Sequence, residues 1–223
     1  MISSDQGPYT SILLGGHRPT TQPLLADLDL DGDAELVIAA VDEVSEDPVV
    51  VALGLSDTGA SLLWDASLDK GSHPSDPAFA RTDESTGYVL LTTTQESSGA
   101  VWVWKLDSDT GDSNWDGLTL GNTDGDTNSP HVRLPGPIIA NLDANQDDLE
   151  MILTIPTDWD GSSGQDGAEF IGMEIGSGDE VWTFEASNGY ADAPPVAIDT
   201  NGDGQHDRVC LLYTSPSPRD LST

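Results

Sequence analysis

The chain has 223 residues, of which 40 are acidic and only 7 are basic, so its formal net charge at pH 7 is -33. Phosphate groups are bound by clustered Lys and Arg, so this composition argues against a nucleic-acid partner and, for the same reason, against an anionic membrane surface. No apolar run approaches the roughly 18 residues that span a bilayer, and we expect no membrane insertion in this segment. The first residues lack the basic and apolar regions of a secretory signal, so we interpret the chain as beginning inside a larger protein.

Four segments of the chain repeat one pattern: a proline, a short apolar stretch, a polar or acidic loop, and a second apolar stretch. The prolines of the four segments are Pro23, Pro77, Pro137 and Pro195. The first three segments continue with another apolar run, a glycine-containing turn and a tryptophan, which is Trp64, Trp115 or Trp182. Short apolar runs separated by Asp, Gly and Ser clusters predict strands and hairpins. Each complete unit is therefore expected to contain four strands.

A four-stranded unit repeated at this spacing predicts the blades of a β-propeller. The expected fold class is all-β, a partial β-propeller of four-stranded antiparallel blades comprising about three and a half blades of a larger ring. An open solenoid or a sandwich of hairpins is the alternative, but neither requires the unit length and strand order to be preserved three times. The predicted blades are residues 22–75, 76–135, 136–193 and a truncated 194–209.

The two ends of the chain are set apart from these blades. Residues 1–21 are expected to lead into the first blade or to end a preceding one. The run from Cys210 to Asp220, CLLYTSPSPRD, resembles one reading frame of a sequencing adapter, so we exclude residues 210–223 from the fold argument as an artefact. This exclusion removes the single cysteine and leaves the redox compartment undetermined.

Two acidic loops have the same nine-residue pattern, DLDLDGDAE from Asp27 and DTNGDGQHD from Asp199. Oxygen-bearing side chains fall at positions 1, 3, 5 and 9 and a glycine falls at position 6. Calcium takes about 6 to 8 oxygen ligands, and a tight loop with this spacing is able to surround it. An EF-hand is excluded because its closing Glu falls at position 12 between helices, whereas position 12 from Asp27 is Ile38, inside an apolar strand.

The predicted calcium ligands of these two loops are Asp27, Asp29, Asp31, Asp33, Glu35, Asp199, Asn201, Asp203, Gln205 and Asp207. Asp33 and Gln205 would contribute through their backbone carbonyls, and His206 is expected to face solvent. The third unit predicts a weaker or differently registered site, with Asn141, Asp143, Asn145, Asp147 and Glu150 as its ligands and Asp148 as an alternative to Asp147. The second unit has too few ligands around Asp83. The competing interpretation is that all these residues are solvated turn formers on an acidic surface.

These loops resemble the calcium loops of FG-GAP and VCBS repeats, as found in integrin α-subunit propellers and many secreted microbial proteins. The glycine turn followed by tryptophan is similar to the blade signature of quinoprotein-type propellers, and this resemblance implies tryptophans docked between neighbouring blades. The order of motifs from Glu174 to Val209 is similar to the C-terminal propeller of the PilC/PilY family of type IV pilus-tip adhesins.

The expected function is that of a calcium-binding, secreted or cell-surface β-propeller that acts as a binding or adhesion module for a protein or glycan, with pilus association as a further implication of the resemblance. One alternative is a quinoprotein-type (PQQ) dehydrogenase, and another is a structural scaffold within a larger surface protein. The four histidines are scattered and no HExxH or GxSxG motif is present, so we expect no enzyme. Millimolar extracellular calcium suits such loops, which favours an extracellular location.

Overall fold

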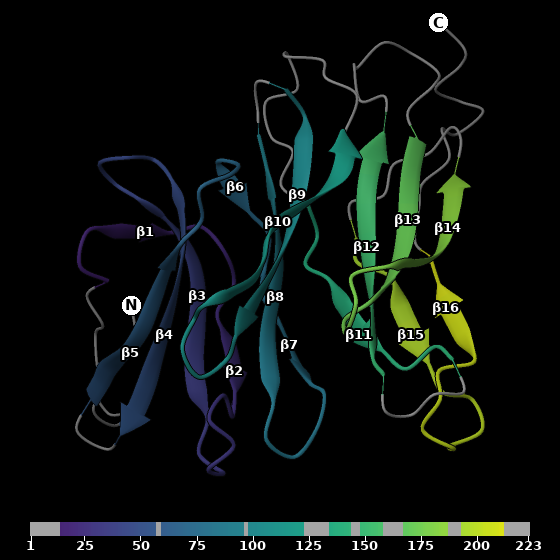
Figure 1. Cartoon of the computed structure of the whole chain (residues 1–223), viewed down its shortest axis with the longest axis horizontal. Helices are drawn as coiled ribbons and strands as arrows, with labels where there is room; N and C mark the ends of the chain where they lie inside the picture. Colours follow the sequence, from purple (N-terminus) through teal and green to yellow (C-terminus); the bar gives the residue numbers. More distant parts are fainter. Residues whose placement is uncertain are drawn as a thin grey trace, which may run out of the picture.

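The computed structural model describes residues 14–56, 59–95, 98–122, 134–143, 148–157, 167–186 and 193–211. Every regular element in these ranges is a β-strand, and neighbouring strands pair antiparallel. Figure 1 shows the sheets side by side along the long axis of the molecule. The all-β class is confirmed, and the succession of sheets is consistent with partial propeller-like blades.

Three sheets and one strand pair follow one another along the chain. The first sheet contains β1 (His17–Pro19), β2 (Leu24–Ala26), β3 (Glu35–Asp42), β4 (Pro48–Ser56) and β5 (Gly59–Ser67). The second contains β6 (His73–Pro74), β7 (Ala78–Arg81), β8 (Gly87–Thr94), β9 (Ala100–Asp107) and β10 (Ser113–Asn122). The third contains β11 (Ile138–Ala140), β12 (Glu150–Thr157), β13 (Gly167–Glu174) and β14 (Glu180–Ala186), and the final pair is β15 (Val196–Ile198) with β16 (Arg208–Cys210).

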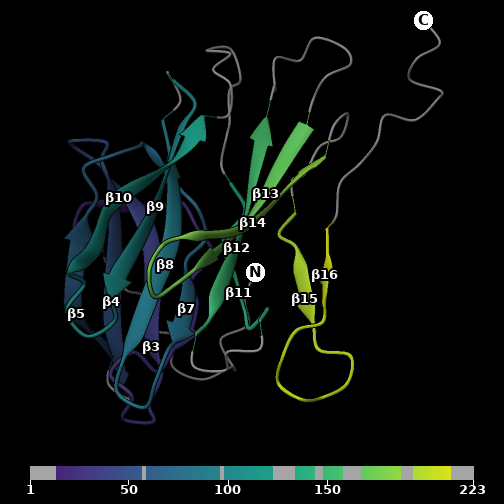
Figure 2. The same ribbon diagram turned by 45° about the vertical axis from the view of Figure 1, so that its right-hand side comes forward.

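The short strand β11 contacts both β7 of the second sheet and β15 of the final pair, and β6 contacts β3 and β4 of the first sheet. Figure 2 shows the same succession from a second direction, with β15 and β16 beyond the third sheet. The strand β16 includes Cys210, the first residue of the segment set aside as an adapter, and residues 212–223 lie outside the described ranges.

In each of the first two sheets, one edge of the sheet is formed by two short strands in place of one long strand, and the second short strand follows a proline. We call this divided edge the inner strand. Strands β1 and β2 both pair with β3, and β6 and β7 both pair with β8. In the first break, Thr21 Oγ1 donates to Ala39 O at 2.8 Å and accepts from Ala39 N at 3.1 Å. In the second break, Ser75 Oγ accepts from Thr92 N at 3.0 Å. The hydroxyl thus replaces the ladder hydrogen bond that the interrupted strand would leave unmade.

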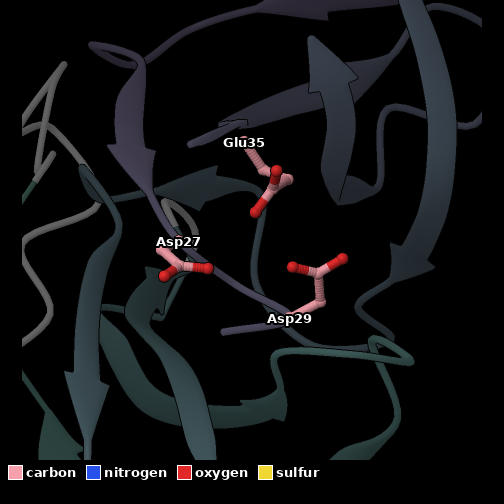
Figure 3. Close-up of side chains that lie close together, drawn as sticks. All are labelled: Asp27, Asp29 and Glu35. Carbon is pink, nitrogen blue, oxygen red and sulfur yellow. The ribbon is translucent and has the colours of Figure 1, made fainter. Parts of the chain in front are cut away.

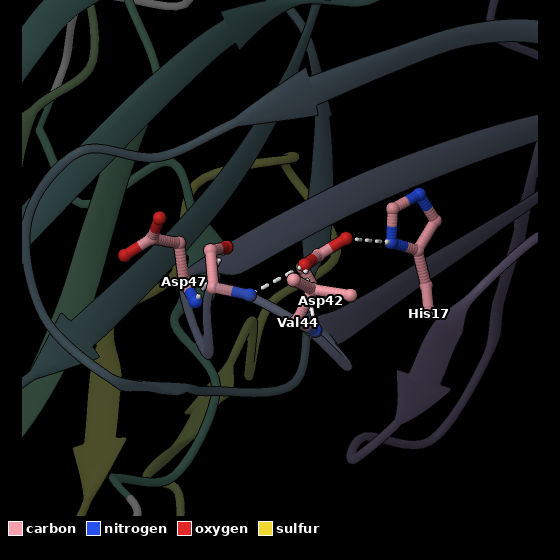
Figure 4. Close-up of polar contacts among 5 residues, drawn as sticks. His17, Asp42, Val44 and Asp47 are labelled. Carbon is pink, nitrogen blue, oxygen red and sulfur yellow. Dashed lines mark hydrogen bonds and ion pairs between the residues drawn. The ribbon is translucent and has the colours of Figure 1, made fainter.

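The turn between β3 and β4 is closed by Asp42 (Figure 4). Its Oδ1 accepts hydrogen bonds from Val44 N at 2.9 Å and Ser45 N at 2.8 Å, and its Oδ2 lies 3.3 Å from Nδ1 of His17 in β1. Hydrogen bonds from the backbone of Ser45 and Val44 hold the pKa of Asp42 below its ordinary value. One carboxylate therefore shapes the turn and connects β1 to β3.

The interface between the first two sheets is closed by Trp64, which is only 7% exposed. A Cβ added to Gly111, in the turn that follows β9, would lie 2.6 Å from the Trp64 ring, and Gly111 has a φ of +74°. Trp64 Nε1 donates to Ser108 O at 2.8 Å. The tryptophan of the first sheet thus packs onto a glycine of the second sheet that no other residue could replace without strain.

The second interface repeats this contact with Trp115 and Gly178, whose added Cβ would lie 3.1 Å from the ring. Here the amine Nζ of Lys105 donates to Ile175 O at 2.8 Å, the carbonyl that corresponds to Ser108 O. Lys105 is buried, lies 5.1 Å from the Trp115 ring centre and 4.1 Å from that of Tyr88, and burial lowers its pKa. Packing between neighbouring units is thereby confirmed for Trp64 and Trp115, whereas Trp182 packs on Phe170 and Ala168 of its own sheet.

Candidate metal centre

The first acidic loop connects β2 to β3 and brings three carboxylates together. Asp27 directly follows β2, Glu35 begins β3, and Asp29 lies in the loop between them. One oxygen from each of the three lies within 4.8 Å of the other two. Figure 3 shows the three carboxylates facing a shared space. Positions 1, 3 and 9 of the sequence pattern therefore converge.

Backbone hydrogen bonds to these carboxylates give the loop its shape. Asp27 Oδ2 accepts from Gly32 N at 3.2 Å, and Asp29 Oδ1 accepts from Asp31 N at 3.2 Å. Gly32 has a φ of +99°, a left-handed conformation that a glycine adopts without a steric cost. Asp31 and Asp33 are exposed and lie outside the three-carboxylate cluster found among the described residues.

The cluster fits one calcium ion by size. Calcium–oxygen distances are about 2.3 to 2.6 Å, so two ligands on opposite sides of one ion are separated by about twice that distance, roughly 4.6 to 5.2 Å. The three oxygens lie within 4.8 Å of one another, so no pair is farther apart than two ligands of one ion can be. Asp27 Oδ1 is buried and has no hydrogen-bond partner, which is the condition of an oxygen that a cation would satisfy.

The burial of Glu35 and the charges around it favour a bound cation. Glu35 is 5% exposed, and burial raises the pKa of its carboxylate, with further contributions from the negative charges of Asp29, Asp31 and Asp27. Leu28 N donates to Glu35 Oε2 at 2.8 Å, which acts in the opposite direction. A bound cation would relieve both the burial and the repulsion.

The fourth-unit loop, between β15 and β16, forms the same hydrogen bonds as the first. Asp199 Oδ2 accepts from Gly204 N at 2.9 Å, and Asp207 Oδ2 accepts from Thr200 N at 2.9 Å. Bonds from the backbone of Gly204 and Gly202 lower the pKa of Asp199, and the Thr200 hydroxyl does the same for Asp207.

Within that loop, the carboxylates of Asp203 and Asp207 both approach one amide. Asn201 Nδ2 donates to Asp203 Oδ2 at 3.0 Å and to Asp207 Oδ1 at 3.4 Å. The amide of Asn201 therefore lies between two of the predicted ligands. The side chain of Gln205 is directed to the third unit, where its Nε2 donates to Leu142 O at 3.4 Å.

The third-unit loop is described only at its two ends, and Asn145 and Asp147 lie outside the described residues. Leu142 N donates to Glu150 Oε2 at 2.6 Å, and burial is the main cause of the raised pKa of Glu150. Asn141 is 7% exposed and its Oδ1 has no hydrogen-bond partner. Asp143 is exposed, whereas Asp148 is half-buried.

A shared bond emerges that the sequence pattern did not reveal. In all three loops the closing carboxylate accepts from the backbone N–H of the second loop residue, which is Leu28, Leu142 or Thr200. Because the third loop is one residue longer, its closing Glu150 is eight residues from Leu142, whereas the other two pairs are separated by seven. The spacing of the acidic residues could have indicated this bond.

The expectation that His206 faces solvent is wrong. Its side chain is half-buried, its backbone N donates to Asn141 O at 2.6 Å, and its Nδ1 lies 3.1 Å from Asn141 N. The fourth loop therefore packs against the start of the third loop. No sequence signal indicated this contact, because the two residues are 65 positions apart.

The second unit has a simple turn at the position of these loops. Asp83 Oδ1 accepts from Ser85 N at 2.7 Å, and Arg81 Nε donates to Asp83 O at 3.0 Å. Within the described ranges, no cluster of three metal-binding side chains includes Asp83.

Comparison of the chain with protein-family models gives no match, and comparison with curated proteins gives none either. In the part of the chain that the structure describes, there is no helix of the length and apolarity needed to cross a membrane.

Proposed function

We propose that the chain is a calcium-binding segment of a secreted or cell-surface propeller, in which bound calcium orders the acidic loops that precede β3 and β16. The convergence of Asp27, Asp29 and Glu35 carries this proposal, together with the buried and unpartnered oxygen of Asp27. The match of hydrogen bonds between the first and fourth loops supports a second site at Asp199 to Asp207, although among the described residues the cluster of three converging carboxylates is confined to the first loop.

The chemistry of the ligands favours calcium over other common cations. The cluster contains only carboxylate oxygens, the hard ligands that calcium and magnesium prefer to imidazole or thiolate. A flexible loop that combines side-chain and carbonyl oxygens suits calcium, because magnesium requires a near-ideal octahedron. Extracellular sites of this kind bind with dissociation constants of about 0.1 to 1 mM, which is the reason to place the protein outside the cell.

Order at these loops would serve recognition of a partner. Bringing several carboxylates together without a cation costs repulsion, so the apo loops should be more mobile than the loaded loops. The proposed role is therefore a calcium-ordered binding or adhesion module whose acidic loops contact a protein or glycan at a cell surface.

Isothermal titration calorimetry of the whole chain tests this proposal. Calcium should bind at millimolar or lower concentration, and Asp29→Asn should remove one site while Asp203→Asn removes another. Asp47→Asn changes an exposed carboxylate outside the loops and is the matched control. Heats that are the same in the wild type, Asp29→Asn and Asp203→Asn would reject the proposal, and a stronger response to magnesium would reject the choice of ion.

A further inference from the structure

The first acidic loop is anchored to the neighbouring sheet through the backbone of Leu28. This residue follows Asp27, is 1% exposed, and packs with Leu106 and Trp104 of the second sheet. Its N–H donates to Glu35 Oε2, and its carbonyl accepts from Ser108 Oγ at 2.7 Å, a contact between residues 80 positions apart. The loop thus accepts a hydrogen bond from a side chain that lies outside it.

Ser108 connects the backbone of Leu28 to Trp64, the tryptophan that closes the interface between the first two sheets. Its carbonyl accepts from Trp64 Nε1 at 2.8 Å, and its own N–H donates to Gly87 O at 3.1 Å. Ser108 is 4% exposed. Buried hydrogen bonds in series are stronger than exposed ones and are sensitive to the loss of any member.

We propose that Ser108 is a positioning residue for the metal loop, so that the calcium affinity of the first loop depends on how the second sheet packs against it. Ser108 fixes the carbonyl of Leu28 and so the backbone of this residue, and the Leu28 N–H fixes the Glu35 carboxylate among the converging ligands. This inference rests on the proposed calcium function. Because coupling between binding and packing is reciprocal, calcium at the first loop also strengthens the contact between the first two sheets.

The third loop repeats the arrangement with different residues. Leu142 N donates to Glu150 Oε2, and Leu142 O accepts from Gln205 Nε2 at 3.4 Å. The carbonyl of the second loop residue again accepts from a side chain of the next unit. The position of the bond, rather than the identity of the donor, is what the two loops share.

Calcium titration of Ser108→Ala in the full chain tests the inference. Loss of a neutral hydrogen bond costs about 0.5 to 1.5 kcal/mol, and about 1.4 kcal/mol is a factor of ten, so the dissociation constant of the first site should rise about 2- to 12-fold. Ser108→Cys keeps the size and a weak donor, and its affinity should lie between those of the wild type and Ser108→Ala.

Ser75→Ala is the matched control, because Ser75 is also fully buried in the second sheet and accepts from Thr92 N, yet it bonds no residue of the loop. It should reduce stability without changing calcium affinity. The inference is overturned if the Ala and Cys variants at position 108 both bind calcium as tightly as the wild type, or if Ser75→Ala weakens binding equally. A wild-type chain that binds no calcium would instead overturn the proposed function itself.

The reciprocal effect is measured by tryptophan fluorescence. Calcium should change the emission of the wild type, and this change should be lost in Trp64→Phe while the calorimetric binding persists. Identical calcium-induced changes in the wild type and Trp64→Phe would refute the coupling to the interface.

Discussion

The contact between Trp64 and Gly111 predicts a large loss of stability for Gly111→Ala. With a φ of +74° at this position, a left-handed alanine costs about 1 to 2 kcal/mol. The added Cβ would also lie 2.6 Å from the Trp64 ring, and overpacking of a buried site costs about 1 to 3 kcal/mol more. The ring is unable to move away freely, because its Nε1 is bonded to Ser108 O.

The expected total is therefore about 2 to 5 kcal/mol. Urea denaturation in the presence of a chelator, followed by circular dichroism, measures this loss without a contribution from calcium. Gly15→Ala is the matched control, since Gly15 has a φ of +62° with nothing within 4 Å of the added Cβ, and it should cost only the backbone strain. Equal losses in the two variants would show that Trp64 is not packed against Gly111, and the proposed interface between sheets would be refuted.

Three further predictions concern charged residues. In the presence of a chelator, burial and the neighbouring carboxylates raise the pKa of Glu35. The folded chain then binds more protons than the unfolded chain, so its stability should fall as pH rises through that pKa. Urea titrations at several pH values should show this fall in the wild type and not in Glu35→Gln, and the same dependence of stability on pH in both proteins would contradict the prediction. Burial lowers the pKa of Lys105, so stability should instead rise with pH between the lowered pKa and the ordinary pKa of a lysine. This rise should be smaller in Lys105→Met and should persist in the control Lys70→Met. Asp42→Ala removes the bonds to Val44, Ser45 and His17, so hydrogen exchange should become faster at His17 and Arg18, and exchange rates equal to those of the wild type would argue against the connection.

The strands and acidic loops were predictable because their signals are local. Alternating carboxylates followed by an apolar run indicated the loop from Asp27 to Glu35, and the structure brings positions 1, 3 and 9 of that loop together. The tryptophans were expected between units, and Trp64 and Trp115 lie there. The strands and loops depend on residues within one unit, where spacing along the chain determines spacing in space, whereas the tryptophan packing was implied by the resemblance of the glycine turn to a propeller blade.

The hydrogen bonds between units, unlike the tryptophan packing, were not predictable from these patterns. Ser108 bonds Leu28, and His206 bonds Asn141, across 80 and 65 residues respectively. The sequence shows an ordinary serine in a turn and a histidine in a variable loop position. Only the packing of one sheet on the next brings these side chains to a backbone group that would otherwise be buried without a partner.

The first strand position also differs from the expected unit. The sheet of the first unit begins at His17, and β6 begins at His73, because the inner strand is interrupted and resumes after a proline. The prediction took Pro23 and Pro77 as the starts of the first strands, and it did not assign the segments before these prolines to the same units. The bonds of Thr21 and Ser75 to the central strand explain how both segments remain in one sheet.

These two hydroxyl groups offer a marker for relatives that have lost their acidic loops. Each stands two residues before the proline that restarts the strand, in Thr-Gln-Pro and Ser-Asp-Pro, and the second unit keeps this tripeptide although its loop has only Asp83 and Glu84. The third and fourth units have Pro135 and Ala193 at this position instead, so a search for a hydroxyl residue, any residue and proline ahead of an apolar stretch would find units like the second, which a search for aspartate-rich loops overlooks.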